Sequence, residues 1–174
     1  MSEPSSGGLT HLDQDGSTRM VDVSDRASTD REATATGEVL INQAAWEAVS
    51  SAAISKGNVL EVAKLAGIMG AKRTPDLIPL CHPLTLTHIA VDARLASNPA
   101  RVQLRATVRC HGNTGVEMEA LTAISVAALT VIDMIKSGDP WAQAGSIGLL
   151  AKGGGRSGDV RRPGTVDPEA PGEG

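Results

Sequence analysis

The chain has 174 residues, a formal net charge of −4 and a pI near 5.5, which fits one domain and argues against general nucleic-acid binding, since that needs a basic surface. It contains no Phe or Tyr and two Trp, so it lacks aromatic platforms on which bases stack. A core of small aliphatic side chains buries little area per residue, and we therefore expect a homo-oligomer.

The two ends of the chain are predicted to flank one folded domain. Residues 1–15 are rich in Ser, Gly and Asp, and residues 153–174 are rich in Gly, Pro and charged side chains. Segments of this composition without apolar periodicity do not build a core. We expect a flexible segment at 1–15, a single domain over 16–158 and a flexible tail over 159–174.

The first half of the domain predicts one strand and two helices. Alternation over residues 34–42 indicates a strand, and residues 43–54 have helical propensity with Asn42 as the N-cap. Lys56-Gly57 ends that helix, and Asn58 can cap the next one, which runs to about residue 73.

A Pro-rich run at residues 72–84 follows the second helix. Three prolines at a spacing of four predict a stiff, non-helical backbone. The run carries Lys72, Arg73, Asp76 and His82. Two interpretations stay open: a buried connector with polar ends, or one wall of a site.

The second half predicts a hairpin, a long helix and a last strand. Residues 86–97 and 101–110 alternate around the turn Asn98-Pro99-Ala100, and residues 116–136 are helical up to Ser137-Gly138. Residues 146–151 form the last strand. The order predicts an α+β fold, a ferredoxin-like antiparallel sheet with helices packed on one face and one extra helix.

The expected cellular compartment is inferred from sequence features of membrane and secreted proteins that we do not find. No apolar run approaches the roughly 20 residues of a membrane span, and the N-terminus has no signal-like apolar segment. Cys81 and Cys110 are too few for a disulfide framework. We expect a cytoplasmic protein without membrane contact.

Both ends of the long helix carry candidate site residues. Glu117 and Glu119 in the first turn either complement the helix dipole or accept hydrogen bonds from a base or sugar. Asp133 and Lys136 share a helix face and are either a surface ion pair or an acid–base pair. Because the neighbours of Asp133 are apolar, we expect its carboxyl to be partly buried, with a shifted pKa.

The helix geometry restricts how these ends are used. Glu119 and Asp133 lie within about 40° of one face but about 21 Å apart along the axis. One compact site cannot use both ends of one helix. Either an extended ligand spans them, or a neighbouring subunit supplies its own helix end, which agrees with the expected oligomer.

Two further patterns stay weak. Cys81-His82 and Cys110-His111 lack the Cys-x-x-Cys spacing of zinc sites, so we expect no metal. The glycine-rich run 152–158 lacks the Walker pattern. It either wraps an anion once ordered or begins the flexible tail.

A series of motifs, in order along the chain, resembles the cyclic pyranopterin monophosphate synthase family, molybdenum cofactor biosynthesis protein C. The motifs are Met20-Val21-Asp22-Val23-Ser24, Lys56-Gly57, Ala71-Lys72-Arg73-Thr74, Asp76-Leu77-Ile78-Pro79-Leu80-Cys81-His82-Pro83, and Thr114-Gly115-Val116-Glu117-Met118-Glu119-Ala120 through Asp133-Met134. The resemblance extends from about Leu9 to Gly158. It implies conversion of 3′,8-cyclo-7,8-dihydroguanosine 5′-triphosphate to cyclic pyranopterin monophosphate, with release of pyrophosphate and without a cofactor.

The resemblance also implies an assembly and residue roles. The family is a ferredoxin-like hexamer of three dimers with active sites at subunit interfaces. It implies that Asp133 is the general acid or base, with Lys136 one turn on and Lys56 as the catalytic lysine. The implied substrate-binding residues are Leu80, Cys81, His82, Met118 and Glu119, and further polar positions of the pocket are Arg31, Lys72, Glu117 and Lys152.

Three other functions remain as alternatives. A non-catalytic nucleotide-binding or regulatory paralogue would return the triphosphate unchanged. A degenerate family member would serve as a structural partner. A GTP phosphohydrolase would carry a metal-binding carboxylate cluster, which the sequence does not show.

Overall fold

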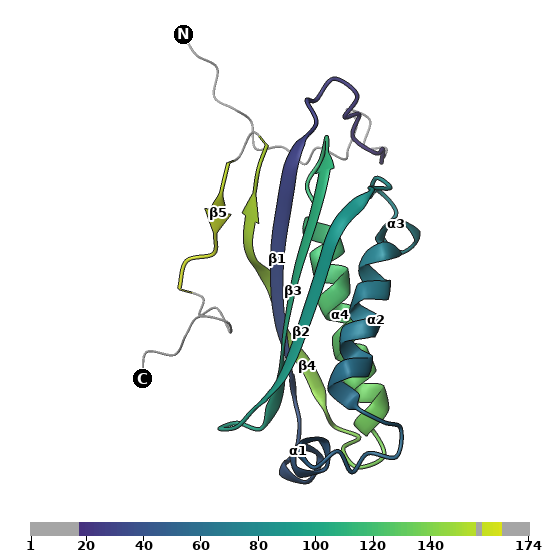
Figure 1. Cartoon of the computed structure of the whole chain (residues 1–174), viewed down its shortest axis with the longest axis vertical. Coiled ribbons are helices and arrows are strands. Elements are labelled where there is room, and N and C mark those ends of the chain that lie inside the picture. The colour runs from purple at the N-terminus through teal and green to yellow at the C-terminus, as the bar shows by residue number, and fades with distance from the viewer. Residues whose placement is uncertain (1–17, 156–157, 165–174) are drawn as a thin grey trace.

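The computed structural model describes residues 18–155 and 158–164. A five-stranded antiparallel sheet in the order β2-β3-β1-β4-β5 carries α2 and α4 side by side on one face (Figure 1). The elements are β1 (Thr29–Leu40), α1 (Gln43–Ser50), α2 (Val59–Lys72), α3 (Thr74–Leu77), β2 (Leu86–Ala96), β3 (Arg101–Gly112), α4 (Glu117–Ile135), β4 (Gln143–Gly153) and β5 (Val160–Arg161). The predicted α+β class is confirmed.

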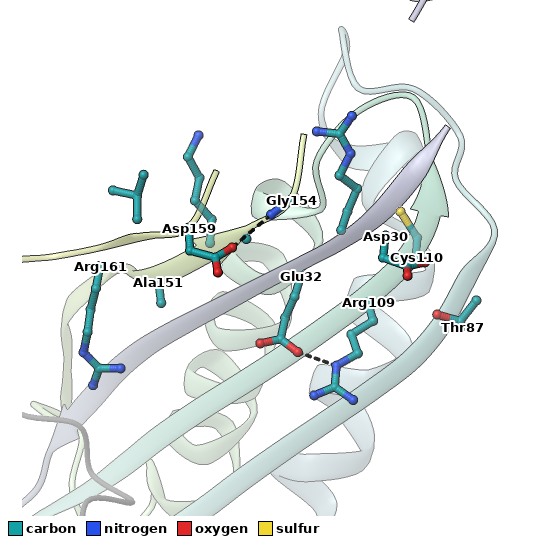
Figure 2. A pocket seen from close by; sticks show the side chains of 13 residues that line it. Asp30, Glu32, Thr87, Arg109, Cys110, Ala151, Gly154, Asp159 and Arg161 are labelled. Atoms are coloured by element: carbon teal, nitrogen blue, oxygen red, sulfur yellow. Dashed lines mark hydrogen bonds and ion pairs between the residues drawn. The ribbon is translucent and has the colours of Figure 1, made fainter. Parts of the chain in front are cut away.

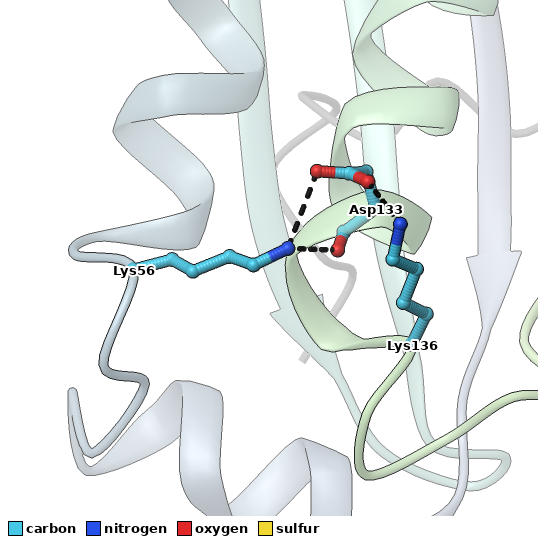
Figure 3. A network of polar contacts seen from close by, with 3 residues as sticks. All are labelled: Lys56, Asp133 and Lys136. Carbon is cyan, nitrogen blue, oxygen red and sulfur yellow. Dashed lines mark hydrogen bonds and ion pairs between the residues drawn. The ribbon is translucent and has the colours of Figure 1, made fainter.

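The two predicted helix caps are confirmed. The Asn42 side chain accepts a hydrogen bond from the Ala45 N–H at 2.8 Å, and the Asn58 side chain accepts from Leu60 and Glu61. Each asparagine satisfies backbone donors that the first helical turn leaves unpaired. The loop between the two helices carries Lys56 (Figure 3).

Three expectations about local structure are corrected. Residues 74–77 form the short helix α3 inside the Pro-rich run, because Pro75 occupies the first turn, where a missing N–H costs nothing. Strand β1 begins at Thr29, five residues before the predicted start, because it pairs with β3 over its whole length. Strand β5 was not predicted, since two exposed residues show no alternation; it lies within the expected tail.

Small side chains let α4 pack closely on α2 and on the sheet. A Cβ added at Gly67 would lie 3.0 Å from the Ala123 carbonyl oxygen, and one added at Gly70 would lie 2.8 Å from a methyl carbon of Val126. The core is aliphatic, as expected: its fully buried members include Ala33, Ala35, Val39, Leu104, Ala106, Ala120, Ala123, Ile124, Ala127 and Val131. This packing fixes both ends of α4 relative to the strands.

Helix α4 corrects the expectation that no apolar run approaches the length of a membrane span. Among the described residues it is the one helix long and apolar enough to cross a membrane. However, 56% of its most apolar 18-residue window is buried within the protein. Burial of this kind is typical of the core helix of a globular domain.

Candidate functional site

The predicted site residues form two groups at opposite ends of α4. The residues implied to bind substrate surround its first turn, and Lys56, Asp133 and Lys136 lie at its last turn. Glu119 and Asp133 are separated by about 21 Å along the helix axis. Within one chain the two groups therefore do not form a single compact site.

Three adjoining cavities surround the first turn of α4 and contain every residue implied to bind substrate. The inner cavity, of about 270 Å³, is lined by Leu80, Cys81, His82, Glu117, Met118 and Glu119. The outer cavity, of about 740 Å³, is lined by Arg31, Glu117, Lys152 and residues 153–155. A side cavity is lined by Lys72 and Glu119. Glu117 therefore lines both the inner and the outer cavity, and Glu119 lines both the inner and the side cavity.

The Pro-rich run contributes one wall of the inner cavity, as the second of its two interpretations proposed. His82 lies 2.8 Å through its Nε2 from the Val21 carbonyl oxygen. Because a carbonyl only accepts hydrogen bonds, this contact places a proton on Nε2. It also ties the run to the N-terminal segment, which brings Val21, Val23 and Arg26 to the same cavity.

Glu119 is a buried carboxyl at the junction of the inner and side cavities. Its residue is 3% exposed, and burial raises its pKa, with the neighbouring Glu117 adding to the effect. Burial, and then Glu119 itself, raise the pKa of the Cys81 and Cys110 thiols. The two sulfurs are therefore protonated at neutral pH and are not activated nucleophiles.

The glycine-rich turn after β4 packs against Arg31. Gly154 and Gly155 have φ values of +87° and +71°, and a side chain at Gly155 would overlap the Arg31 guanidinium. Arg31 Nε donates to the Gly112 carbonyl oxygen at 3.3 Å, and Lys152 Nζ lies 3.1 Å from Glu117 Oε1. Arg31, Lys152 and a backbone turn without side chains thus face the outer cavity, which three carboxylates also line: Asp25, Glu32 and Glu117. A turn of this kind can bind an anion through its N–H groups.

The second group is a three-residue network (Figure 3). Lys56 Nζ donates to the Asp133 carbonyl oxygen at 2.6 Å and lies 3.3 Å from its carboxylate. Lys136 Nζ lies 2.7 Å from the other carboxylate oxygen. One carboxylate therefore bridges two ammonium groups, although the lysines come from different segments of the chain.

The expected burial of Asp133 is wrong. Its side chain is 61% exposed, because α4 buries one sector on the sheet and another against α2, and Asp133 lies on the remaining sector. Hydrogen bonds from Lys136 and Lys56 lower its pKa. In this chain Asp133 is therefore an exposed carboxylate stabilised by two lysines and suited to accept a proton.

Some cavity-lining residues were not assigned from the sequence. Thr114 and Gly115 line both the inner and outer cavities; their place in the same matched motif as Glu117 was a usable signal. Arg26 also lines both cavities, but the fold brings it there, and no local pattern marks it. Asp76 stays without a role.

The described residues contain no group of three or more His, Cys, Asp or Glu side chains placed to hold a metal ion. Cys81-His82 belongs to the inner cavity. His111 Nδ1 instead lies 2.8 Å from an Asp30 oxygen at the sheet surface. The two Cys-His pairs thus belong to different surroundings.

Comparisons with known proteins agree on one family. Residues 20–155 match the MoaC family. The chain is 58% identical over 151 residues to a cyclic pyranopterin monophosphate synthase of Roseiflexus sp., covering 87% of this chain and 96% of that protein. Proteins of the same name from Parvibaculum lavamentivorans (52% identity; 88% and 96% covered) and Streptomyces griseus (51%; 93% and 90%) are also similar.

Proposed function

The chain belongs to the MoaC family, and on that premise we propose that it is a cyclic pyranopterin monophosphate synthase of molybdenum cofactor biosynthesis. It converts 3′,8-cyclo-7,8-dihydroguanosine 5′-triphosphate to cyclic pyranopterin monophosphate and releases pyrophosphate. The observation that carries the proposal is the gathering of every implied substrate-binding residue around the first turn of α4.

The charges of the site suit this substrate. A nucleoside triphosphate carries about four negative charges, which Arg31, Lys152 and Lys72 help to neutralise through charge-assisted hydrogen bonds. Glu117 and Glu119 offer acceptors for the N–H groups of the purine-derived ring. Because Glu119 is buried, a ring that donates hydrogen bonds to its carboxylate offsets the cost of ionising it.

The lysine–aspartate network suits the proton transfers. Cyclic phosphate formation joins a sugar hydroxyl oxygen to the α-phosphorus while the bond to the leaving pyrophosphate breaks, and the pterin ring closes with further proton transfers. Asp133 is ionised and can accept a proton, and Lys56 and Lys136 can donate one. Their direct contacts with Asp133 couple the three groups during proton exchange.

We propose that two subunits complete each active site. The separation of about 21 Å along α4 supports this proposal, since a second copy could bring its network to the cavities of the first. Exposed apolar side chains support association of the helical layer and of the end near Asp133: they are Leu65, Met69, Leu129 and Trp141. The proposed assembly is a hexamer of three dimers of cytoplasmic subunits.

The ferredoxin-like topology belongs to the same proposal. The strand order β2-β3-β1-β4, with α2 and α4 as crossovers on one face, supports it. Helix α1 and strand β5 are then additions to that frame. The topology matters for function because the start of β1, the end of β4 and the start of α4 line the same outer cavity.

The chief alternative is a nucleotide-binding module without catalysis. Incubating the protein with the cyclised nucleotide and measuring pyrophosphate separates the two functions. The enzyme releases one pyrophosphate per nucleotide and forms a pterin that fluoresces after oxidation. Recovery of intact triphosphate with no pterin would show binding alone, and release of inorganic phosphate from GTP would show a phosphohydrolase.

A further inference from the structure

Among the described residues, two carboxyl side chains are buried: Glu119, which lines the cavities, and Asp139, to which the proposed chemistry gives no role. Asp139 is 4% exposed and lies three residues after Lys136, in the segment that follows α4. A buried carboxyl needs hydrogen-bond donors to offset the loss of its hydration. The donors that Asp139 contacts therefore indicate its role.

Asp139 joins the segment after α4 to the start of α1. One of its carboxyl oxygens accepts a hydrogen bond from the Asn42 N–H at 2.6 Å, and the other accepts from the Trp141 N–H at 3.2 Å. Beside it, the Asn42 side-chain amide donates to the Gly138 carbonyl oxygen at 3.2 Å. Because Asn42 also caps α1, these contacts tie the start of α1 to the end of α4.

Another carboxylate that joins two elements shows why the burial of Asp139 matters. Glu32 of β1 pairs with Arg109 of β3 on the open face of the sheet (Figure 2), but its side chain is 44% exposed. Exposed ion pairs contribute little, because water screens them. The hydrogen bonds of Asp139 are formed by a side chain shielded from water, where they are stronger.

Apolar packing leaves a gap between the segments that Asp139 joins. A cavity of about 250 Å³ lies between α1 with its following loop and the end of α4; Ile54 and Lys56 line one side, and Met134 and Gly138 line the other. Helix α1 has only eight residues, and helices this short are marginal on their own. The contacts of Asp139 therefore help to fix α1 and the loop that carries Lys56.

The two lysines of the network depend on this loop to different degrees. Lys136 lies three residues after Asp133, so their contact is local. Lys56 reaches Asp133 from the loop after α1 (Figure 3), and its flexible stem meets the carboxylate only when that loop is held in place. Misplacing a catalytic group by about 1 Å can cost about 100-fold in rate.

We propose that Asp139 is a positioning residue of the active site, which holds the loop between α1 and α2 against the end of α4 so that Lys56 contacts Asp133. The inference rests on the function proposed above, in which Lys56 and Asp133 exchange protons. Asp139 itself does not contact the substrate. Its loss should therefore lower the rate of the chemical step and spare substrate binding, because the implied substrate-binding residues surround the opposite end of α4.

Turnover of the Asp139→Asn variant tests the proposal in the enzyme. The amide has one acceptor oxygen where the carboxylate has two, so one backbone N–H loses its partner. We expect kcat to fall about 10- to 100-fold, with KM changed less than about twofold. Thr34→Val is the matched control, since it removes a buried hydrogen bond with Thr107 inside the sheet and should leave kcat unchanged. An equal fall of kcat in the control would overturn the proposal.

The pKa of Asp133, measured from the pH dependence of its side-chain carbon resonance by NMR, tests the same contact without turnover. Hydrogen bonds from Lys136 and Lys56 lower this pKa, so Asp139→Asn should raise it, as the direct variant Lys56→Ala does. An unchanged pKa in Asp139→Asn would overturn the positioning role even if the wild-type protein forms the pterin. A raised pKa would support that role even if no pterin forms.

A second variant, Asn42→Ser, applies if thermal unfolding shows that Asp139→Asn does not fold. Serine keeps the cap of α1 and removes only the contact of the Asn42 amide with Gly138. It should raise the pKa of Asp133 in the same direction by a smaller amount. In that case an unchanged pKa of Asp133 in folded Asn42→Ser protein overturns the proposal.

Discussion

At the scale of single residues, Asp133 and Glu119 are carboxyls in opposite surroundings. Asp133 is exposed and held by two lysines, which lower its pKa. Glu119 is buried, which raises its pKa. The first is suited to proton transfer as a carboxylate, and the second to recognition of a ligand that offers N–H donors.

Replacing Asp133 by Asn tests its catalytic role. Removal of a general acid–base group lowers rates by about 10²–10⁴-fold, so we expect a fall of that size in pterin formation. Little change in thermal stability should accompany it, because the side chain is exposed. Glu61→Gln is the matched control, since Glu61 forms an ion pair of the same i,i+3 spacing with Lys64 on α2; equal losses in both variants would remove Asp133 from the catalytic set.

The raised pKa of Glu119 predicts the direction of a stability change with pH. At pH values between the ordinary glutamate pKa of 4.5 and the raised pKa of Glu119 in the folded protein, the folded state binds more protons than the unfolded state. The free energy of unfolding therefore falls as the pH rises through this range. Glu119→Gln should remove this loss and be more stable than wild type at pH 7 but not at pH 4. Denaturant unfolding of both proteins at both pH values measures this difference in stability. The same difference between variant and wild type at pH 4 and pH 7 would contradict the assigned effect of burial on the Glu119 pKa.

At the scale of elements, the close packing of α2 on α4 fixes where the site residues lie. Three features could be predicted from the sequence because each depends on local chemistry: the two asparagine caps, the hairpin and the long helix. Helix α3 was missed because Pro75 was weighed as a helix breaker rather than as a first-turn residue. The exposure of Asp133 was missed because apolar neighbours on a helix do not reveal which sector remains uncovered.

Gly70→Ala tests the helix packing. The added Cβ would lie 2.8 Å from Val126, and overpacking of this kind costs about 1–3 kcal/mol, against a gain of about 1 kcal/mol in helix propensity. We expect net destabilisation in denaturant unfolding. Gly145→Ala is the control, because a Cβ there meets nothing within 4 Å; a stabilised Gly70→Ala protein would show that the helices separate readily.

At the scale of the whole molecule, the distance between the two ends of α4 is the basis for the proposed second subunit. From the sequence, 14 residues of helix separate Glu119 from Asp133 by about 21 Å, which an extended ligand or a neighbouring subunit would have to bridge. The structure adds exposed apolar side chains on α2 and α4, and Trp141 beyond α4, which is 88% exposed. The contacts of one subunit with another could not be derived from the sequence, because they depend on surfaces that the whole fold assembles.

Mixing two inactive variants, with pterin fluorescence as the readout, tests the shared active site most directly. Asp133→Asn lacks the proposed proton-transfer group and Lys152→Ala lacks a proposed anion contact, so each alone should form little product. After dissociation and reassembly together, half of the dimers pair unlike variants and regain one intact site, which predicts about a quarter of wild-type activity. If the wild-type protein forms the pterin but the mixed variants are no more active than either variant alone, the active site is not completed by two subunits.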